Sequence, residues 1–494
     1  MSLSQRKLAK LWVKACKLHH AGDLDQALAL YGRVRGAIPF PKEIPNDAVK
    51  AAETLMKLSV KYPMAPMLVH NLAVAARQRH SASRQLSSGA TTEEIEKFGR
   101  LAMYYMSLAV LCDPTNAIVL HNLGVFHNGR NEWNEALWCL WAATRQMPEL
   151  GESYRVAGNI LGTKGNVAGM MDAFEKSKAC PVKGGDDEYG RALLLLSLGE
   201  YEEGWRLHES RWKTVEFNYG YRRPDVRGPR WAGEPLDGRT LYVHGEQGAG
   251  DVIQFGRFVA GIEGGTVIVE VLESLVPLFQ ASFPRLTVVK RGDPPPEHDL
   301  NVPMMSLPWA FRTTIDTVPA PLPVPAIEDR ALWRTIRDAP GLKVGIAWAG
   351  SRAHPNDSTR SMPDELLGRL AGTPGVTFVN LQVGERADAF TRLGDGQLDI
   401  TPQLTTYLDT AAALQALDLV ITVDTSVAHL AGSCGVPTWI CLPIHSEWRW
   451  MIGRRDTPWY PTATLWRQTK PNDWSTVLDP MREQLTTGLL TEAA

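Results

Sequence analysis

The sequence predicts an α plus α/β protein: a helical solenoid in the first half of the chain, followed by a pair of doubly wound α/β domains. Three observations predict it. A 34-residue period runs through the first half. Short apolar runs alternate with helical stretches in the second half, and a proline-rich segment at 318–330 separates two such series. The predicted domains are 1–215, 216–328, and 329–494 with a C-terminal helix.

The solenoid is predicted from small and large residues that recur together. Gly124 recurs 34 residues later as Gly158, and Leu140 recurs as Phe174. A small residue lets the two helices of a unit approach closely, and a proline ends each unit because it cannot continue the helix. These prolines are Pro114, Pro148 and Pro181. The pattern resembles the tetratricopeptide repeat, which has the same period.

About six such units would fill residues 1–215, with an exposed polar loop inserted at 79–97. Arrays of this kind form a curved solenoid whose concave face binds proteins. A His-Asn pair recurs on the first helix of two units, as His70, Asn71, His121 and Asn122. These residues are candidate contacts in a protein-binding groove, or they are ordinary solvated positions. A purely structural or dimerising array is the alternative to a binding array.

Composition excludes several classes of function. The net charge of −2 gives no sign of a nucleic-acid partner, and the six cysteines form no CxxC pair, which argues against a disulfide framework or a zinc site. Apolar residues make up 44% of the chain, yet they form neither a run long enough to span a membrane nor the apolar core of a signal peptide. A cytoplasmic protein with no membrane span is therefore expected.

The first α/β domain opens with a strand followed by "GEQGAGD", residues 245–251. The glycine spacing matches neither the dinucleotide nor the Walker pattern. Asp251 is either a helix cap or a general base that accepts a proton from an incoming hydroxyl. In the second case Gln247, Gly248 and Gly250 would let an acceptor approach closely.

The second α/β domain contains a segment suited to an anion. A buried strand at 419–423 runs into Asp424, Thr425 and Ser426, and a helix then begins with His429 in its first turns. Exposed N–H groups and the helix dipole favour a diphosphate at such a place. The alternative is a helix cap with a packed histidine.

Further candidates for the donor site follow two other strands. Residues 348–361 form a polar, arginine-containing loop in which Ser351, Asn356 and Arg360 suit phosphate binding. Glu385, after "LQVG", is a candidate ligand of a ribose hydroxyl. Core packing, rather than stacking on a base or sugar, is predicted for Trp448, Trp450, Trp459 and Tyr460.

Together the motifs G-x-G-D, W-A-G-S and D-T-S-x-x-H resemble those of ADP-heptose heptosyltransferases, a family of GT-B glycosyltransferases. "HPNDSTRS" and "PIHSEWRWMIGRRDTPWYPTATLWRQ" resemble, more closely, bacterial proteins that join tetratricopeptide repeats to such a domain. The resemblance implies a GT-B pair of Rossmann-like domains and an inverting, metal-independent transfer from a nucleotide-sugar, with no other cofactor. It also implies that Asp251 is the base and that the donor phosphates contact Asp424, Thr425, Ser426 and His429.

The first α/β domain spans only about 100 residues, which is short for a GT-B acceptor domain. We therefore expect the repeats to complete the acceptor surface, which favours Ser/Thr hydroxyls of a protein acceptor. Because some proteins of this kind are associated with flagellin glycosylation, flagellin is the candidate. A repeat scaffold with a degenerate transferase domain, or transfer to a glycan or lipid, are the alternatives. The nucleotide, the sugar and homo-oligomerisation stay open.

Overall fold

The computed structural model describes residues 117–182, 184–214, 225–327, 331–352 and 357–487, with scattered residues before 117 and Phe217. His70, Asn71 and Asn356 lie outside the described residues, as does the loop predicted at 79–97 apart from Glu93. The chain separates into two compact units: Met1–Gly162 with Asn166–Val182, and Thr163–Gly165 with Lys183–Ala494.

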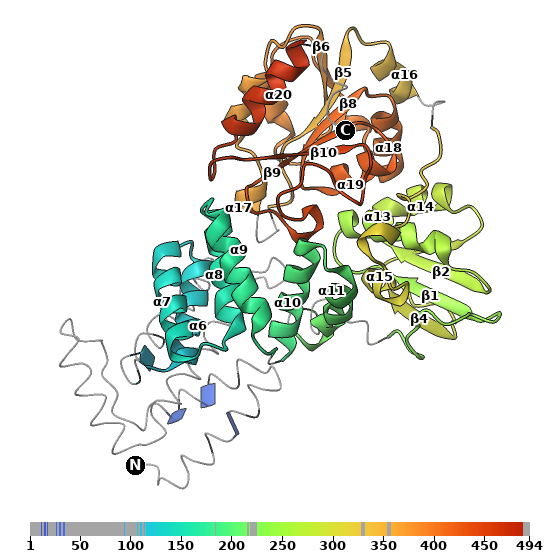
Figure 1. The fold of residues 1–494 in the computed structure, drawn as a ribbon. Coiled ribbons are helices and arrows are strands. Elements are labelled where there is room, and N and C mark those ends of the chain that lie inside the picture. The colour runs from blue at the N-terminus through green and yellow to red at the C-terminus, as the bar shows by residue number, and fades with distance from the viewer. Residues whose placement is uncertain are drawn as a thin grey trace. The chain divides into compact units, whose positions relative to one another are not determined.

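The described part of the first unit consists of paired helices (Figure 1). They are α6 (Ala117–Gly129), α7 (Trp133–Gln146), α8 (Gly151–Thr163) and α9 (Val167–Ala179). Asparagine side chains cap α6 and α9: Asn116 accepts from the backbone N–H of Ile118 and Val119, and Asn166 accepts from that of Gly169.

The recurring glycines are where the paired helices touch. A Cβ on Gly124 would lie 2.8 Å from Cγ of Leu140, and one on Gly158 would lie 2.4 Å from Cε1 of Phe174. Both distances are shorter than carbon atoms tolerate, so the 34-residue pattern records a steric requirement.

A third pair, α10 (Gly185–Leu198) and α11 (Tyr201–His208), continues the pattern and leads into the short 3-10 helix η2 (Glu209–Lys213). This pair belongs to the second compact unit. It packs on both α/β domains, because Leu196, Tyr201 and Trp205 join the same buried cluster as side chains from each of them.

The first α/β domain has a parallel sheet in the order β3-β2-β1-β4 within the described residues. Its strands are β1 (Thr240–His244), β2 (Thr266–Val271), β3 (Thr287–Lys290) and β4 (Leu300–Pro303). The intervening helices are α13 (Ala249–Gly256), α14 (Val276–Ser282) and α15 (Leu307–Ala310), with the 3-10 turns η3 (Arg257–Gly261), η4 (Glu273–Leu275), η5 (Met304–Ser306) and η6 (Ile315–Thr317).

The second α/β domain has a larger parallel sheet, with the described strands in the order β10-β9-β8-β5-β6-β7. The strands are β5 (Leu342–Ala347), β6 (Val376–Asn380), β7 (Leu398–Asp399), β8 (Leu419–Val423), β9 (Thr438–Leu442) and β10 (Ala463–Arg467). The helices are α16 (Ala331–Arg337), α17 (Asp357–Arg360), α18 (Tyr407–Gln415), α19 (Ser426–Ser433) and α20 (Ser475–Thr487). The 3-10 helices are η7 (Asp364–Arg369), η8 (Ala387–Leu393), η9 (Thr401–Gln403) and η10 (Trp448–Trp450).

Helices cover both faces of the larger sheet (Figure 1). On one face, α20 contributes Val477 and Met481 to a buried cluster with residues of β5, β6, β8 and β9; α18 and α19 cover the other. The predicted fold class, a helical repeat array followed by two doubly wound α/β domains, is confirmed. The boundaries predicted at 215 and 328 stay predictions. The 3-10 helix η7 begins after Pro363 and ends at Arg369.

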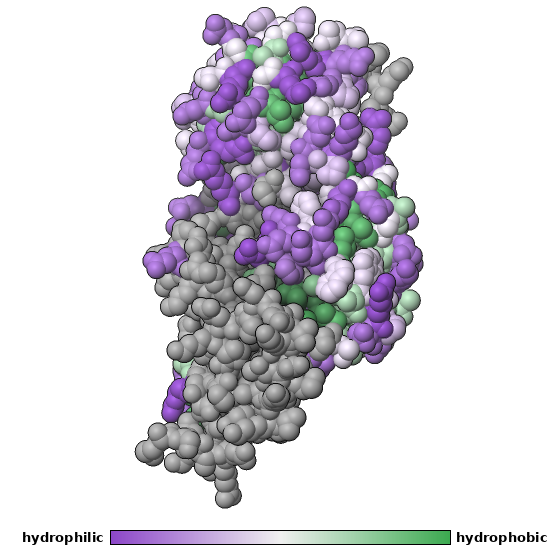
Figure 2. All heavy atoms as spheres, turned by 90° about the vertical axis from the view of Figure 1, so that its left-hand side faces the viewer, coloured by the Kyte–Doolittle hydropathy of each residue, from purple (hydrophilic) through white to green (hydrophobic). Residues whose placement is uncertain are grey.

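The surface is mixed in character. Hydrophilic residues dominate much of the coloured face in Figure 2, and hydrophobic residues gather there in small patches. Trp138 of α7 is the most exposed of the large hydrophobic side chains described, at 70%. Within the described residues, none of the helices has the length and apolar character needed to cross a bilayer.

Candidate active site

The topology of the two sheets explains why distant motifs meet. In the smaller sheet β4 returns to the far side of β1, and in the larger sheet β8 returns to the far side of β5. Ligands of open α/β sheets bind outside the carboxyl ends of strands at such reversals. The loops that follow β1, β5 and β8 carry "GEQGAGD", "WAGSR" and "DTS", the motifs predicted to form the site.

Asp251 lies in the first turn of α13 and uses both carboxylate oxygens. One accepts from the backbone N–H of Gly248 at 2.9 Å, so Asp251 does cap its helix, as one alternative predicted. The other is ion-paired with the guanidinium of Arg449. A carboxylate has about four lone-pair positions, so Asp251, whose side chain is 18% exposed, keeps acceptor capacity for a substrate hydroxyl.

Arg449 was missed by sequence reasoning. Its Nε donates to Oε1 of Gln254 at 2.7 Å, and its Nη1 donates to Oε2 of Glu447 at 2.7 Å. Burial by itself would lower the pKa of Arg449, but the carboxylates of Glu447 and Asp251 outweigh this effect, so the pKa lies above its usual value. Burial raises the pKa of Glu447, and nearby Asp424 adds to the rise. The one sequence signal was a Glu and an Arg within "SEWRW", among tryptophans.

His429 is buried against the first domain. Its Nδ1 is 2.9 Å from the hydroxyl of Tyr460, and its ring stacks on Trp450 with centroids 5.4 Å apart. A Cβ on Gly250 would lie 2.9 Å from Cδ2 of His429, so the close approach that Gly250 permits is between α13 and α19. Burial, followed by the charge of Arg449, holds the pKa of His429 well below its usual value. The imidazole is therefore neutral.

The beginning of α19 is organised by hydroxyl groups. Thr425 is the cap, accepting from the N–H of Val427 at 3.3 Å, and Ser426 accepts from the hydroxyl of Tyr407 at 2.8 Å. Arg360 reaches the same place from α17, where Nη1 donates to the backbone oxygen of Asp424 at 3.1 Å. The structure thus brings Asp424, Thr425 and Ser426 together with Arg360.

The loop after β5 supports Arg360. Gly350 leaves room for it, since a Cβ there would lie 2.3 Å from Nη2 of Arg360. The hydroxyl of Ser361 accepts from the N–H of Gly350 at 3.0 Å and donates to Asp357 at 2.6 Å. Ser351, in the same loop, is exposed.

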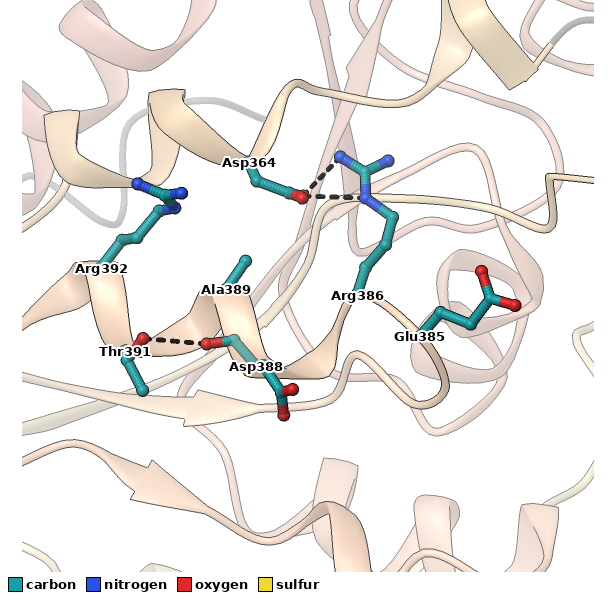
Figure 3. A pocket seen from close by; sticks show the side chains of 7 residues that line it. All are labelled: Asp364, Glu385, Arg386, Asp388, Ala389, Thr391 and Arg392. Carbon is teal, nitrogen blue, oxygen red and sulfur yellow. Dashed lines mark hydrogen bonds and ion pairs between the residues drawn. The ribbon is translucent and has the colours of Figure 1, made fainter.

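Glu385 contacts a different set of residues from those gathered around Asp424. Its side chain is 79% exposed and pairs with Arg352 at 3.2 Å. It lines an open depression of about 430 Å³ with Asp364, Arg386, Asp388, Ala389, Thr391 and Arg392 (Figure 3). Arg386 pairs with Asp364 at 2.5 Å, and none of the lining residues is Asp251, Asp424 or His429. The ribose role of Glu385 stays a prediction.

The tryptophan-rich segment forms core, as predicted. Trp448, Trp450, Trp459 and Tyr460 are at most 5% exposed. Trp448 meets Trp205 of α11 edge-on with ring centroids 5.4 Å apart. The segment that carries Arg449 is thereby packed against the last helix pair.

The candidate groove residues are less open than predicted. His121 is 6% exposed; its Nδ1 is 2.8 Å from the hydroxyl of Ser153 and its Nε2 is 3.4 Å from Glu152. It therefore links α6 to α8. Asn122 is half-buried. The role of His121 and Asn122 in protein binding stays a prediction. Asn122 is the better candidate of the two because it is less buried.

No protein-family model matches the chain. It is similar to Protein FlbA of Caulobacter vibrioides, with 27% identity over 432 residues that cover 74% of this chain and 72% of FlbA. A solved glycosyl transferase family 9 protein from Veillonella parvula has a TM-score of 0.40 and 13% identity, covering 53% of this chain and 100% of its own. An ADP-heptose lps heptosyltransferase II from E. coli has a TM-score of 0.36 and 12% identity, covering 51% and 99%.

Proposed function

We propose that the protein is an inverting glycosyltransferase that moves a sugar from a nucleotide-sugar to Ser/Thr hydroxyls of a protein acceptor recruited by the repeats. Flagellin is the candidate acceptor. The observation that carries the proposal is the meeting of two helix N-termini at the sheet reversals. Asp251 lies in the first turn of α13, and Gly250 beside it packs against His429 of α19. A candidate base and a candidate anion-binding helix end therefore lie next to each other.

The chemistry follows from that arrangement. The donor diphosphate binds at the N-terminus of α19, where Arg360 adds positive charge. The acceptor hydroxyl attacks the anomeric carbon on the face opposite the diphosphate and passes its proton to Asp251. The new bond joins this carbon to the acceptor oxygen, while the bond to the phosphate oxygen breaks. Helix N–H groups and Arg360 stabilise the departing nucleoside diphosphate, a role that a metal ion fills in other enzymes. We propose that no metal is needed.

Asp251→Asn tests the base. The amide keeps the size of the side chain but cannot accept a proton, so transfer is expected to fall about 10²- to 10⁴-fold. Donor affinity should stay the same, because Asp251 contacts the acceptor side. The measurement is intact mass of flagellin incubated with the purified chain and ADP-, GDP-, UDP- or CMP-sugars, with donor affinity from calorimetry. Turnover near that of the unaltered chain would reduce Asp251 to a helix cap.

The donor site is tested by Arg360→Ala and His429→Ala. Losing a charge-assisted contact to phosphate costs about 1.5–3 kcal/mol, and the neutral His429 is expected to cost less than Arg360. Calorimetry with ADP, GDP, UDP and CMP measures this. The control is Arg369→Ala, whose exposed pair with Asp479 at 2.7 Å lies elsewhere in the same domain. If both variants bind every nucleotide as the unaltered chain does, the donor site lies elsewhere; if nothing binds, the scaffold alternative is favoured.

A further inference from the structure

The third repeat pair departs from the first two at two buried positions, one at the end of its second helix and one in the 3-10 helix η2 that follows it. In steps of 34 residues, one position runs through leucine, phenylalanine and histidine, and the other through alanine, serine and arginine. All six are buried. They are Leu140, Phe174 and His208 in one series, and Ala143, Ser177 and Arg211 in the other. Both buried positions carry a titratable side chain where the array meets the α/β domains.

Arg211 is fully buried and bound to the first α/β domain. Its Nη2 donates to Oε1 of Glu246 at 2.7 Å and its Nε donates to Oε2 at 3.1 Å, a two-pronged pair. Nη2 also donates to the hydroxyl of Ser306 at 2.7 Å, and Nη1 donates to Glu209 at 2.9 Å. The side chains of Arg211 and Glu246 are 0% and 1% exposed. Because both buried charges are paired and hydrogen-bonded in this way, the two side chains are held in a single arrangement.

Glu246 lies in the loop that carries Asp251. Oε1 of Glu246 also accepts from the backbone N–H of Met305 at 3.1 Å, so the carboxylate joins three segments. The next residue, Gln247, has a φ of +55°, which is uncommon for a residue other than glycine. Its backbone oxygen accepts from Nη1 of Arg291 at 2.8 Å. Two arginines therefore hold this loop, one of them supplied by the repeats.

We propose that Arg211 is a positioning residue for sugar transfer: through Glu246 it fixes the loop that places Asp251. The inference rests on the proposed function for its catalytic consequence. It makes the end of the repeat array part of the active-site framework. Displacements of about 1 Å at a reacting group cost about 10²-fold in rate, so the effect belongs in kcat.

Two altered chains separate positioning from stability. Arg211→Lys keeps the positive charge but removes the two-pronged pair that the guanidinium makes with Glu246. Arg211→Met with Glu246→Gln removes both charges and keeps an acceptor for the N–H of Met305, so no buried charge is left alone. We expect the double variant to melt near the unaltered chain, yet to lose about 10- to 100-fold in kcat with unchanged affinity for the donor. Lys213→Met is the control, because its exposed pair with Glu188 at 2.7 Å leaves the loop untouched.

Hydrogen exchange gives a readout that does not depend on activity. Amides between Gly245 and Asp251 should exchange faster in Arg211→Lys than in Lys213→Met, without ligand. Unchanged exchange, or a double variant with an unchanged melting temperature and unchanged kcat, would overturn the inference. If the double variant does not fold, unchanged kcat in Arg211→Lys would overturn it equally. An unaltered chain that transfers no sugar would count against the proposed function, while the exchange result would still decide the role of Arg211.

Discussion

Helix pairs α8–α9 and α10–α11 share a 34-residue pattern but are packed differently. In the first pair the small residue, Gly158, is on the first helix and faces Phe174. In the second pair that position is the buried Ala192, and a glycine stands on the second helix instead: a Cβ on Gly204 would lie 2.8 Å from Cδ2 of Leu196. The outward side of α11 then carries Trp205, buried among residues of both α/β domains. The 34-residue period determines which helices pair. The residues on the outer side of a helix pair depend on the element that packs against it.

The test with the largest expected effect compares fragments of the chain that start at two different residues. A fragment that starts at Gly184 keeps α10 and α11 and is expected to be soluble and to melt cooperatively. A fragment that starts at Val215 loses Tyr201 and Trp205, which are 2% and 1% exposed. Removing one large aromatic side chain from a core costs about 3–5 kcal/mol, so losing both approaches the total stability of a domain. Size-exclusion chromatography and thermal melting check this. A monomeric fragment from Val215 would show that the pair is dispensable.

A smaller effect is expected at the glycine inside α8. Gly158→Ala places a methyl group against the rigid ring of Phe174, at 2.4 Å, and is expected to destabilise the first unit by about 1–3 kcal/mol. Gly129→Ala is the control, because a Cβ there meets nothing within 4 Å and alanine favours helix. Urea unfolding measures both. Equal midpoints for the two variants would mean that the pattern does not report close packing.

The smallest expected effect concerns how the stability of the second unit depends on pH. Burial, followed by the charge of Arg467, lowers the pKa of His445 to about 4. The unfolded chain takes up this proton below about pH 6.5 and the folded chain does not, so stability falls as pH drops from 6.5 towards 4. His445→Gln should reduce the loss between pH 7.5 and 5.5 by about 1.4 kcal/mol. Urea unfolding at the two pH values measures it. Identical pH dependence in both chains would mean that folding does not lower the pKa of His445.

The sequence by itself determined the repeats, the strands and the loops that follow them. Apolar runs such as Leu419–Val423 are strands in the structure, because a parallel sheet covered on both faces needs continuous apolar segments. Glycines at repeat contacts were visible because their reason is steric and recurs at a constant spacing. The two-residue strand β7 (Leu398–Asp399) was not predicted, since it is too short to leave a pattern.

Only the tertiary structure decided which charged residues surround Asp251. Arg449 is 198 positions away along the chain, and Arg211 reaches the loop from η2, directly after the last repeat helix. Neither has a local pattern, because a buried ion pair depends on a partner that folding brings near and not on neighbours in sequence. The same holds for the neutral state of His429, which follows from its burial against Trp450 and Tyr460. Local periodicity determines the elements, whereas charge states and loop positions depend on contacts between them.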